Sequence, residues 1–339
     1  MSDLEIKQTA LHELDKTKSF KRLLRLLFRL SIAAVLFWLI FRKIPFSNVM
    51  DALSTVLLPL LLFGMGVFVL VRAFEALQMH IILKALDANV SIVRIFVISL
   101  ISMFYDLFLP GFIAGGAIRW YKFSRCNEMK AESLVAIIVN RFTRTGTIFF
   151  LGLIFWILHR KSTQIENMGI ILIVMTTGCI IGGAIIFASR METGLLNMVQ
   201  QFNNRFVPQS LRRKTEKLIT SFTLLQGFSR RSVLGILGCA AFSQFLSIVG
   251  LFLFARALSM PITFIHGGWV RELTTIASML PITVMGLGVR EGTMVFLLQS
   301  YGIEASLCIA ISFLVLGQML FFSIIGGICE IVEQIGFRF

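Results

Sequence analysis

A short motif that interrupts a helix occurs twice inside apolar stretches of the chain. The pattern is Leu-Pro-x4-Gly-x3-Arg, and its copies lie 171 residues apart, at Leu109-Pro110, Gly115 and Arg119 and at Leu280-Pro281, Gly286 and Arg290. In a lipid bilayer, broken backbone is stable only where protein or a water-filled cavity covers it. Paired Gly/Pro interruptions in the two halves of a membrane protein indicate a transport site. We therefore expect two broken helical elements whose tips lie near the membrane midplane.

The apolar stretches around these motifs are long enough to cross a bilayer. Of the 339 residues, 57% are hydrophobic, and several windows approach the roughly 18–20 apolar residues that a span requires. The net charge of +14 is concentrated in the segments between those windows. This placement favours an anionic lipid surface over nucleic acid, which we do not expect as a partner. The five cysteines lack metal-ligand spacing, so we expect no disulfide, metal or cofactor.

The order of the segments predicts an all-α polytopic membrane protein built as an inverted repeat. The prediction is about three crossings plus one re-entrant helical hairpin per half. Three crossings separate the equivalent segment starts Val56 and Val233, and this odd number inverts the second half. The predicted domains are a cytoplasmic segment at 1–22, a first membrane half at 23–188 with a hairpin at about 91–123, a basic amphipathic cytoplasmic linker at 189–232, and a second half at 233–339 with a hairpin at about 262–301.

The crossings themselves follow the apolar windows. We expect them at Leu23–Phe41, Val56–Leu77, Ser133–Leu158, Met168–Ala188, Val233–Leu258 and Glu304–Ile328. Lys and Arg are enriched in the segments that this topology leaves in the cytoplasm. Both termini are therefore predicted to be cytoplasmic.

Arg119 and Arg290 carry most of the functional prediction. A charge at membrane depth costs about 2.5–3.5 kcal/mol on insertion scales, and each arginine falls near a helix start, where the dipole disfavours a cation. Glycines at the same helix starts would leave backbone N–H groups open to an anion, and the planar guanidinium suits phosphate. The predicted headgroup site comprises Arg119, Arg290, Gly115, Gly116, Gly286, Gly288, Arg141 and Arg144, with the hairpin tips at Pro110, Gly111 and Pro281.

The alternative is that acids of the chain neutralise these arginines. Asp106 is a candidate partner of Arg119, and Glu291 or Glu272 of Arg290; Glu272 is also a candidate proton-coupling acid. Glu75 lies three residues after Arg72 on one helical face, which favours an internal pair over a counter-ion role at the site. Arg141 and Arg144 either line the site or extend to the cytoplasmic interface.

Three classes of function fit a membrane protein with these features. We expect a lipid translocator rather than an enzyme, because the loops contain no acid pair, zinc motif or nucleophile motif typical of a membrane transferase. One alternative is a scaffold whose basic linker docks a lipid-biosynthesis enzyme. The other is an integral-membrane transferase, which would form product from a lipid donor.

The motifs also resemble a known family over roughly residues 20–330. Three strings together resemble the transmembrane, flippase-like region of lysylphosphatidylglycerol synthases and its stand-alone relatives: FLPGFIAGGAIRWYKFSR, NRFTRTGTI and ELTTIASMLPITVMGLGVREG. The resemblance implies about eight membrane segments and translocation of a phospholipid or polyprenyl-phosphate-type lipid in the inner membrane. The positions that match the family pattern are Pro110, Gly111, Gly115, Arg119, Arg141, Pro281, Gly286, Gly288, Arg290 and Glu291.

Two departures from the family pattern bear on the substrate. The family often has a polar residue directly before Leu-Pro-Gly, where this chain has Leu107-Phe108. It also often has an acid beyond the first arginine of the NRFTRTGTI helix, where this chain has Arg144. The second departure makes the expected site more positive. The synthase domain does not follow the last predicted span, so lysyl transfer is not expected.

Overall fold

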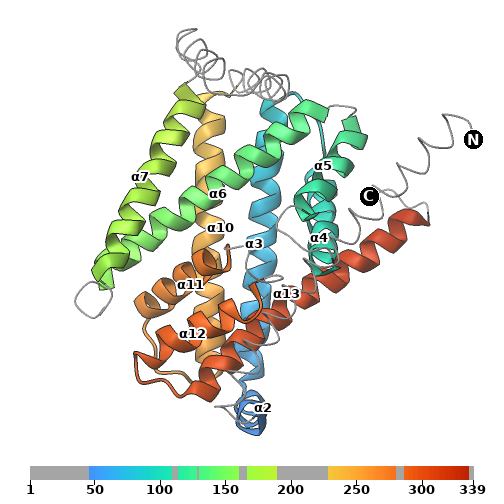
Figure 1. Cartoon of the computed structure of the whole chain (residues 1–339). Helices are drawn as coiled ribbons and strands as arrows, with labels where there is room; N and C mark the ends of the chain where they lie inside the picture. Colours follow the sequence, from blue (N-terminus) through green and yellow to red (C-terminus); the bar gives the residue numbers. More distant parts are fainter. Residues whose placement is uncertain are drawn as a thin grey trace, which may run out of the picture.

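The computed structural model describes residues 46–108, 114–127, 130–159, 166–188, 228–279 and 286–335. Over these ranges the chain forms ten α-helices and no strand, which confirms the all-α prediction (Figure 1). The predicted segment 1–22, the crossing at Leu23–Phe41, residues 189–227 of the predicted linker and the hairpin tips Pro110, Gly111 and Pro281 lie outside the described residues.

Four of the described helices are long and apolar enough to cross a membrane: α3 (Leu58–Ala85), α6 (Lys130–His159), α10 (Arg230–Ala257) and α13 (Ala305–Gln334). They contain 28 to 30 residues, or roughly 42–45 Å at 1.5 Å per residue. The hydrocarbon core is about 30 Å thick, so each helix can span it even when tilted. A further apolar helix, α7 (Glu166–Ala188), packs along α6.

The helices that flank the two motifs are shorter. The first pair is α4 (Ile92–Phe108) and α5 (Ala114–Asn127), and the second is α11 (Phe264–Ser278) and α12 (Val289–Gln299). With 11 to 17 residues, each is roughly 16–26 Å long and does not reach across the hydrocarbon core by itself. Within each pair the two helices contact each other. The remaining helix, α2 (Phe46–Ser54), directly precedes α3 and packs against α13.

Hydroxyl side chains fix where several helices begin. Ser91 Oγ accepts the Arg94 N–H at 3.3 Å before α4, and Thr263 Oγ1 accepts the His266 N–H at 3.2 Å before α11. Ser229 Oγ accepts the Ser232 N–H at 3.1 Å and caps α10 in the same way. Such caps satisfy N–H groups that the helix itself leaves unpaired.

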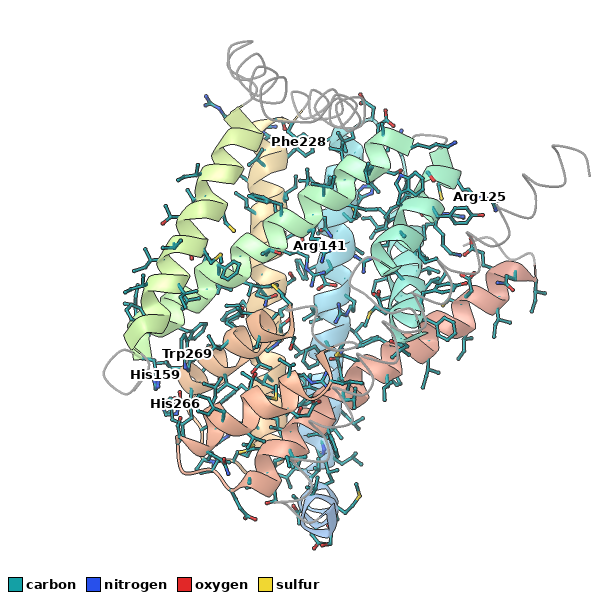
Figure 2. All side chains as sticks on the ribbon, viewed as in Figure 1. Arg125, Arg141, His159, Phe228, His266 and Trp269 are labelled. Atoms are coloured by element: carbon teal, nitrogen blue, oxygen red, sulfur yellow. The ribbon has the colours of Figure 1, made fainter. Side chains whose placement is uncertain are left out.

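The centre of the fold is an antiparallel pair of α3 and α10. Figure 1 shows α2, which leads into α3, at the lower end of this pair, and Figure 2 shows Phe228, which leads into α10, at the upper end. The rings of Phe68 and Phe254 meet across the interface with their centroids 5.3 Å apart. A Cβ on Gly64 would lie 2.8 Å from Phe254, and one on Gly250 would lie 2.7 Å from Phe68, so both glycines make room for a ring.

The short helices pack across the two halves of the chain. α4 lies against α13, and α11 lies against α6. Close approach depends on glycines: a Cβ on Gly326 of α13 would overlap the backbone carbonyl of Leu100 in α4, and one on Gly268 of α11 would overlap the ring of Phe155 in α6. Ion pairs from Lys122 of α5 to Glu330 at 2.6 Å and Glu333 at 2.8 Å join the first pair to the end of α13.

Candidate functional site

A shared carboxylate lies at the mid-length of two membrane-crossing helices. Glu75 of α3 pairs with Arg72 on its own helix, Nη1 to Oε2 at 2.7 Å, and with Arg144 of α6, Nη2 to Oε1 at 2.6 Å. The predicted Arg72–Glu75 pair is therefore present, and Arg144 turns toward the protein interior rather than to the interface. The side chain of Glu75 is 9% exposed, whereas those of Arg72 and Arg144 are 17% and 30% exposed. The side chains of Arg72 and Arg144 thus remain partly accessible to a ligand.

Two more arginines surround this group without an ion pair of their own. Arg119 of α5 donates its Nε–H to Ser102 Oγ at 2.7 Å, and its electrostatic neighbours include Glu75 and Asp106. Arg271 of α11 donates to the hydroxyl of Thr275 one turn along its own helix. Among the described residues, neither guanidinium has a carboxylate within the 4.0 Å of a salt bridge.

These side chains form one cluster, which we call the arginine cluster. It comprises Arg72, Arg119, Arg141, Arg144 and Arg271 with the acids Glu75, Asp106 and Glu272. Electrostatic interactions link Arg119 and Arg271 to Arg72, Arg144 and Glu75, and link Arg141 to Asp106. Figure 2 shows Arg141 near the middle of the fold. The Nε of Arg72 is buried and has no hydrogen-bond partner within the described part of the chain. Such an orphaned donor at a group of cations fits an absent anion.

The backbone N–H groups at the start of the second arms do not form the open anion sites that the glycines predicted. The Gly115 N–H donates to Asp106 Oδ1 at 2.8 Å, and the Gly288 N–H donates to Glu291 Oε2 at 2.5 Å. The prediction is therefore wrong for these two groups. The physical reason is that the chain places its own carboxylate at the positive end of each helix dipole. Gly286 and Gly288, with φ of 72° and 82°, adopt the left-handed turn that precedes α12.

Arg290 is held by internal pairing rather than by the cluster. Its guanidinium hydrogen-bonds Glu291 Oε1, and Ser312 Oγ donates to the same oxygen at 3.3 Å. The side chains of Arg290 and Glu291 are only 6% and 1% exposed. Of the two predicted partners, Glu291 is therefore the correct one. Glu272 instead accepts from Gln244 Nε2 of α10 at 3.2 and 3.3 Å, where it is fully buried.

The predicted site residues thus separate into two groups. Arg119, Arg141, Arg144, Asp106, Glu75 and Glu272 come together in the arginine cluster, while Arg290, Glu291, Gly286 and Gly288 form a buried turn at the start of α12. Gly116 is half-buried and would have nothing within 4 Å of an added Cβ. The sequence prediction missed Arg271. The sequence contains a signal for Arg271. It is an arginine within a short apolar segment, and a charge at membrane depth is costly, which is the reason that Arg119 was selected.

The cluster has the chemistry of an anion site. Five arginines face three carboxylates, and guanidinium groups bind phosphate or carboxylate oxygens with two parallel hydrogen bonds. Over the ranges that the structure describes, no group of three or more His, Cys, Asp or Glu side chains is placed to hold a metal ion. The residues present therefore favour recognition of an anionic group by direct hydrogen bonds.

Comparison with known proteins identifies the family. The sequence model of the lysylphosphatidylglycerol synthase TM region matches residues 26–327. No curated protein and no solved structure matches the chain. The family match covers most of the sequence, and four helices of the described structure are long and apolar enough to cross a membrane. The chain therefore belongs to the family of the lysylphosphatidylglycerol synthase transmembrane region and is a multi-pass membrane protein related to lipid metabolism.

Proposed function

We propose that the protein is an inner-membrane lipid translocator that holds the phosphate of an anionic lipid at the arginine cluster. One observation carries this proposal: Arg119 and Arg271 lie beside three further arginines, and neither has an ion pair within the described residues. Each charge at membrane depth costs about 2.5–3.5 kcal/mol on insertion scales. A bound phosphate offsets that cost with charge-assisted hydrogen bonds. The proposed role is transport rather than catalysis, because the guanidinium groups of the cluster suit binding of an anion.

Repeated landmarks support an inverted repeat as the frame for this transport. α10 begins at Arg230, 172 residues after α3 begins at Leu58, and the caps Thr263 and Ser91 are also 172 residues apart. The left-handed residues that follow α10 and α3, Ser259 and Asp87, differ by 172 again. The contact of α4 with α13 and that of α11 with α6 are equivalent under this repeat.

The short helix pairs support re-entrant hairpins. α4 with α5 and α11 with α12 contact each other pairwise, and each helix is too short to cross alone. In the inverted arrangement the two hairpins enter from opposite faces of the membrane. Transporters of this kind bind cargo near the midplane and rock one repeat against the other. The arginine cluster draws on both halves, with Arg119 from the first hairpin and Arg271 from the second.

Retained lipid tests the proposal. The purified protein is compared by native mass spectrometry with Arg119→Ala/Arg271→Ala, and the lipids released from each are identified. We expect a phosphate-bearing lipid on the wild type and its loss from the double variant. Arg125→Ala is the matched control, because Arg125 lies on the same helix as Arg119 but is exposed and stacks on the Tyr121 ring at 4.8 Å. Equal retention by wild type and double variant, or no lipid on either, overturns the proposed site.

A further inference from the structure

The charges of the arginine cluster do not balance. Its five arginines outnumber its three acids by two, even when Glu75, Asp106 and Glu272 are all ionised. The hairpin tips 109–113 and 280–285 contain no ionisable residue in the sequence, so they do not change this count. Counted over the described residues and these two tips, the cluster therefore carries an excess of two positive charges.

The three acids are already engaged in the protein. Glu75 bridges Arg72 and Arg144 at 2.7 and 2.6 Å, Asp106 accepts the Gly115 N–H at 2.8 Å, and Glu272 accepts from Gln244. None of them is free to move toward Arg119 or Arg271 without giving up its partner. Within the described residues Arg119 and Arg271 have no ion pair, and they mark where the excess positive charge is open to a ligand.

The number of negative charges on the ligand should therefore match this excess. A phosphodiester headgroup brings one negative charge and leaves one arginine uncompensated in a medium where that is costly. A phosphomonoester brings up to two charges, since its second pKa is about 6, and offers three acceptor oxygens. A diphosphate also supplies at least two charges. Both present enough oxygens for two guanidinium groups at once.

This inference rests on the proposed function. We propose that the cluster selects lipids whose headgroup ends in a dianionic phosphate over lipids with a phosphodiester. The dianionic phosphate is either a phosphomonoester or a diphosphate. Arg119 of the first half and Arg271 of the second half hold the dianion between them. With Glu75, Asp106 and Glu272 all ionised, the charge excess is two, and it is larger when one of them is protonated.

Lipid titration tests this selectivity. Purified full-length protein is titrated at pH 8 with phosphatidic acid, phosphatidylglycerol and phosphatidylcholine of identical acyl chains, and with a polyprenyl monophosphate, and the bound fraction is read by native mass spectrometry. We expect phosphatidic acid to bind about tenfold or more tightly than phosphatidylglycerol, given the strength of charge-assisted hydrogen bonds. Comparing the two phosphomonoesters then shows whether the tail is a glycerolipid or a polyprenyl chain.

Two adjacent substitutions change the charge excess in opposite directions. Arg271→Gln lowers it to one and should reduce the preference for phosphatidic acid several-fold. Glu272→Gln raises it to three when the native carboxylate is ionised, while its side chain can still hydrogen-bond Gln244, and it should increase the preference. The second variant keeps the test decisive if the first does not fold. Arg125→Gln, an exposed arginine with no part in the cluster, should leave the preference unchanged.

The outcomes separate this inference from the function on which it rests. If phosphatidic acid and phosphatidylglycerol bind equally and both are lost in Arg119→Ala/Arg271→Ala, the dianion preference is wrong while the phosphate site stands. If neither lipid depends on these arginines, both proposals are wrong. A preference that Arg271→Gln does not reduce, or that Glu272→Gln does not increase, also overturns the inference, because the cluster's charge would not be its origin.

Discussion

Glu75 accepts ion pairs from arginines on two different helices, so its loss should affect stability more than the loss of a peripheral acid. In Glu75→Ala, Arg72 and Arg144 both lose their carboxylate at membrane depth. Removing one partner of a buried pair costs about 3–5 kcal/mol. We expect a clear fall in the thermal unfolding temperature of the purified protein in detergent.

A matched control is Glu333→Ala, whose ion pairs with Arg94 and Lys122 are at the end of α13 and whose side chain is 23% exposed. That variant should lose less stability. Adding Arg144→Met to Glu75→Ala should restore part of the loss, because one of the two uncompensated charges is then absent. Equal destabilisation by the Glu75 and Glu333 substitutions would contradict the central role of Glu75.

Local chemistry could be predicted from single residues, whereas partners across the fold could not. The Arg72–Glu75 pair follows from helical spacing alone, and Arg290 pairs with its neighbour Glu291. By contrast, Glu75 meets Arg144 across the α3–α6 contact, 69 positions along the chain. The glycines at the second arms predicted open N–H groups, but Asp106 reaches Gly115 from the other arm of the pair. A carboxylate on a neighbouring element leaves no signature in the glycine pattern itself.

At the scale of elements, Gly326 controls how closely α13 approaches α4. A Cβ at this position would overlap the Leu100 carbonyl, and backbone cannot move aside as a flexible side chain can. Gly326→Ala should therefore destabilise the protein, with overpacking costing about 1–3 kcal/mol. The measurement is thermal unfolding in detergent. Gly317→Ala on the same helix is the control, because nothing lies within 4 Å of an added Cβ there.

The control should leave stability unchanged or raise it, since alanine favours a helix over glycine by about 0.5–1 kcal/mol. If Gly326→Ala and Gly317→Ala change the thermal stability equally, helix propensity rather than packing determines the result. The close approach of α13 to α4 at Gly326 would then be contradicted. The same contact joins α4 of the first half to α13 of the second half, so the proposed lipid transport should also fall in Gly326→Ala.

The elements themselves were largely predictable because apolar runs end at charges, glycines and prolines. The predicted hairpin starts at about 91 and 262 correspond closely to the starts of α4 at Ile92 and α11 at Phe264. The largest difference is the end of α3, which was predicted at Leu77 and lies at Ala85. Polar residues interrupt the apolar run there, yet Gln78 is buried and donates to Thr143 Oγ1 of α6 at 2.8 Å. Tertiary burial of a polar side chain cannot be seen in a hydropathy window.

At the scale of the whole molecule, the inverted repeat predicts that equivalent turns lie on opposite sides of the membrane. Asn89 follows α3 and Ser259 follows α10, both are exposed, and α3 and α10 run antiparallel (Figure 1). In a variant without the five native cysteines, Asn89→Cys and Ser259→Cys provide one reactive thiol each. If both termini are cytoplasmic, as the loop charges predict, a membrane-impermeant maleimide should label Ser259→Cys in right-side-out vesicles. It should label Asn89→Cys only after the vesicles are permeabilised.

The permeabilised sample is the control for thiol access. Both cysteines must react there before a lack of labelling in intact vesicles can be assigned to the membrane. Labelling of both cysteines from one side would contradict the inverted repeat and would require α3 and α10 to be parallel. If Asn89→Cys is labelled in intact vesicles and Ser259→Cys only after permeabilisation, the inverted repeat stands but the termini lie outside. Under the proposed function this pattern has a mechanistic consequence. Hairpins that enter from opposite faces would bring Arg119 and Arg271 to one phosphate, and rocking of the halves would expose that phosphate to each side in turn.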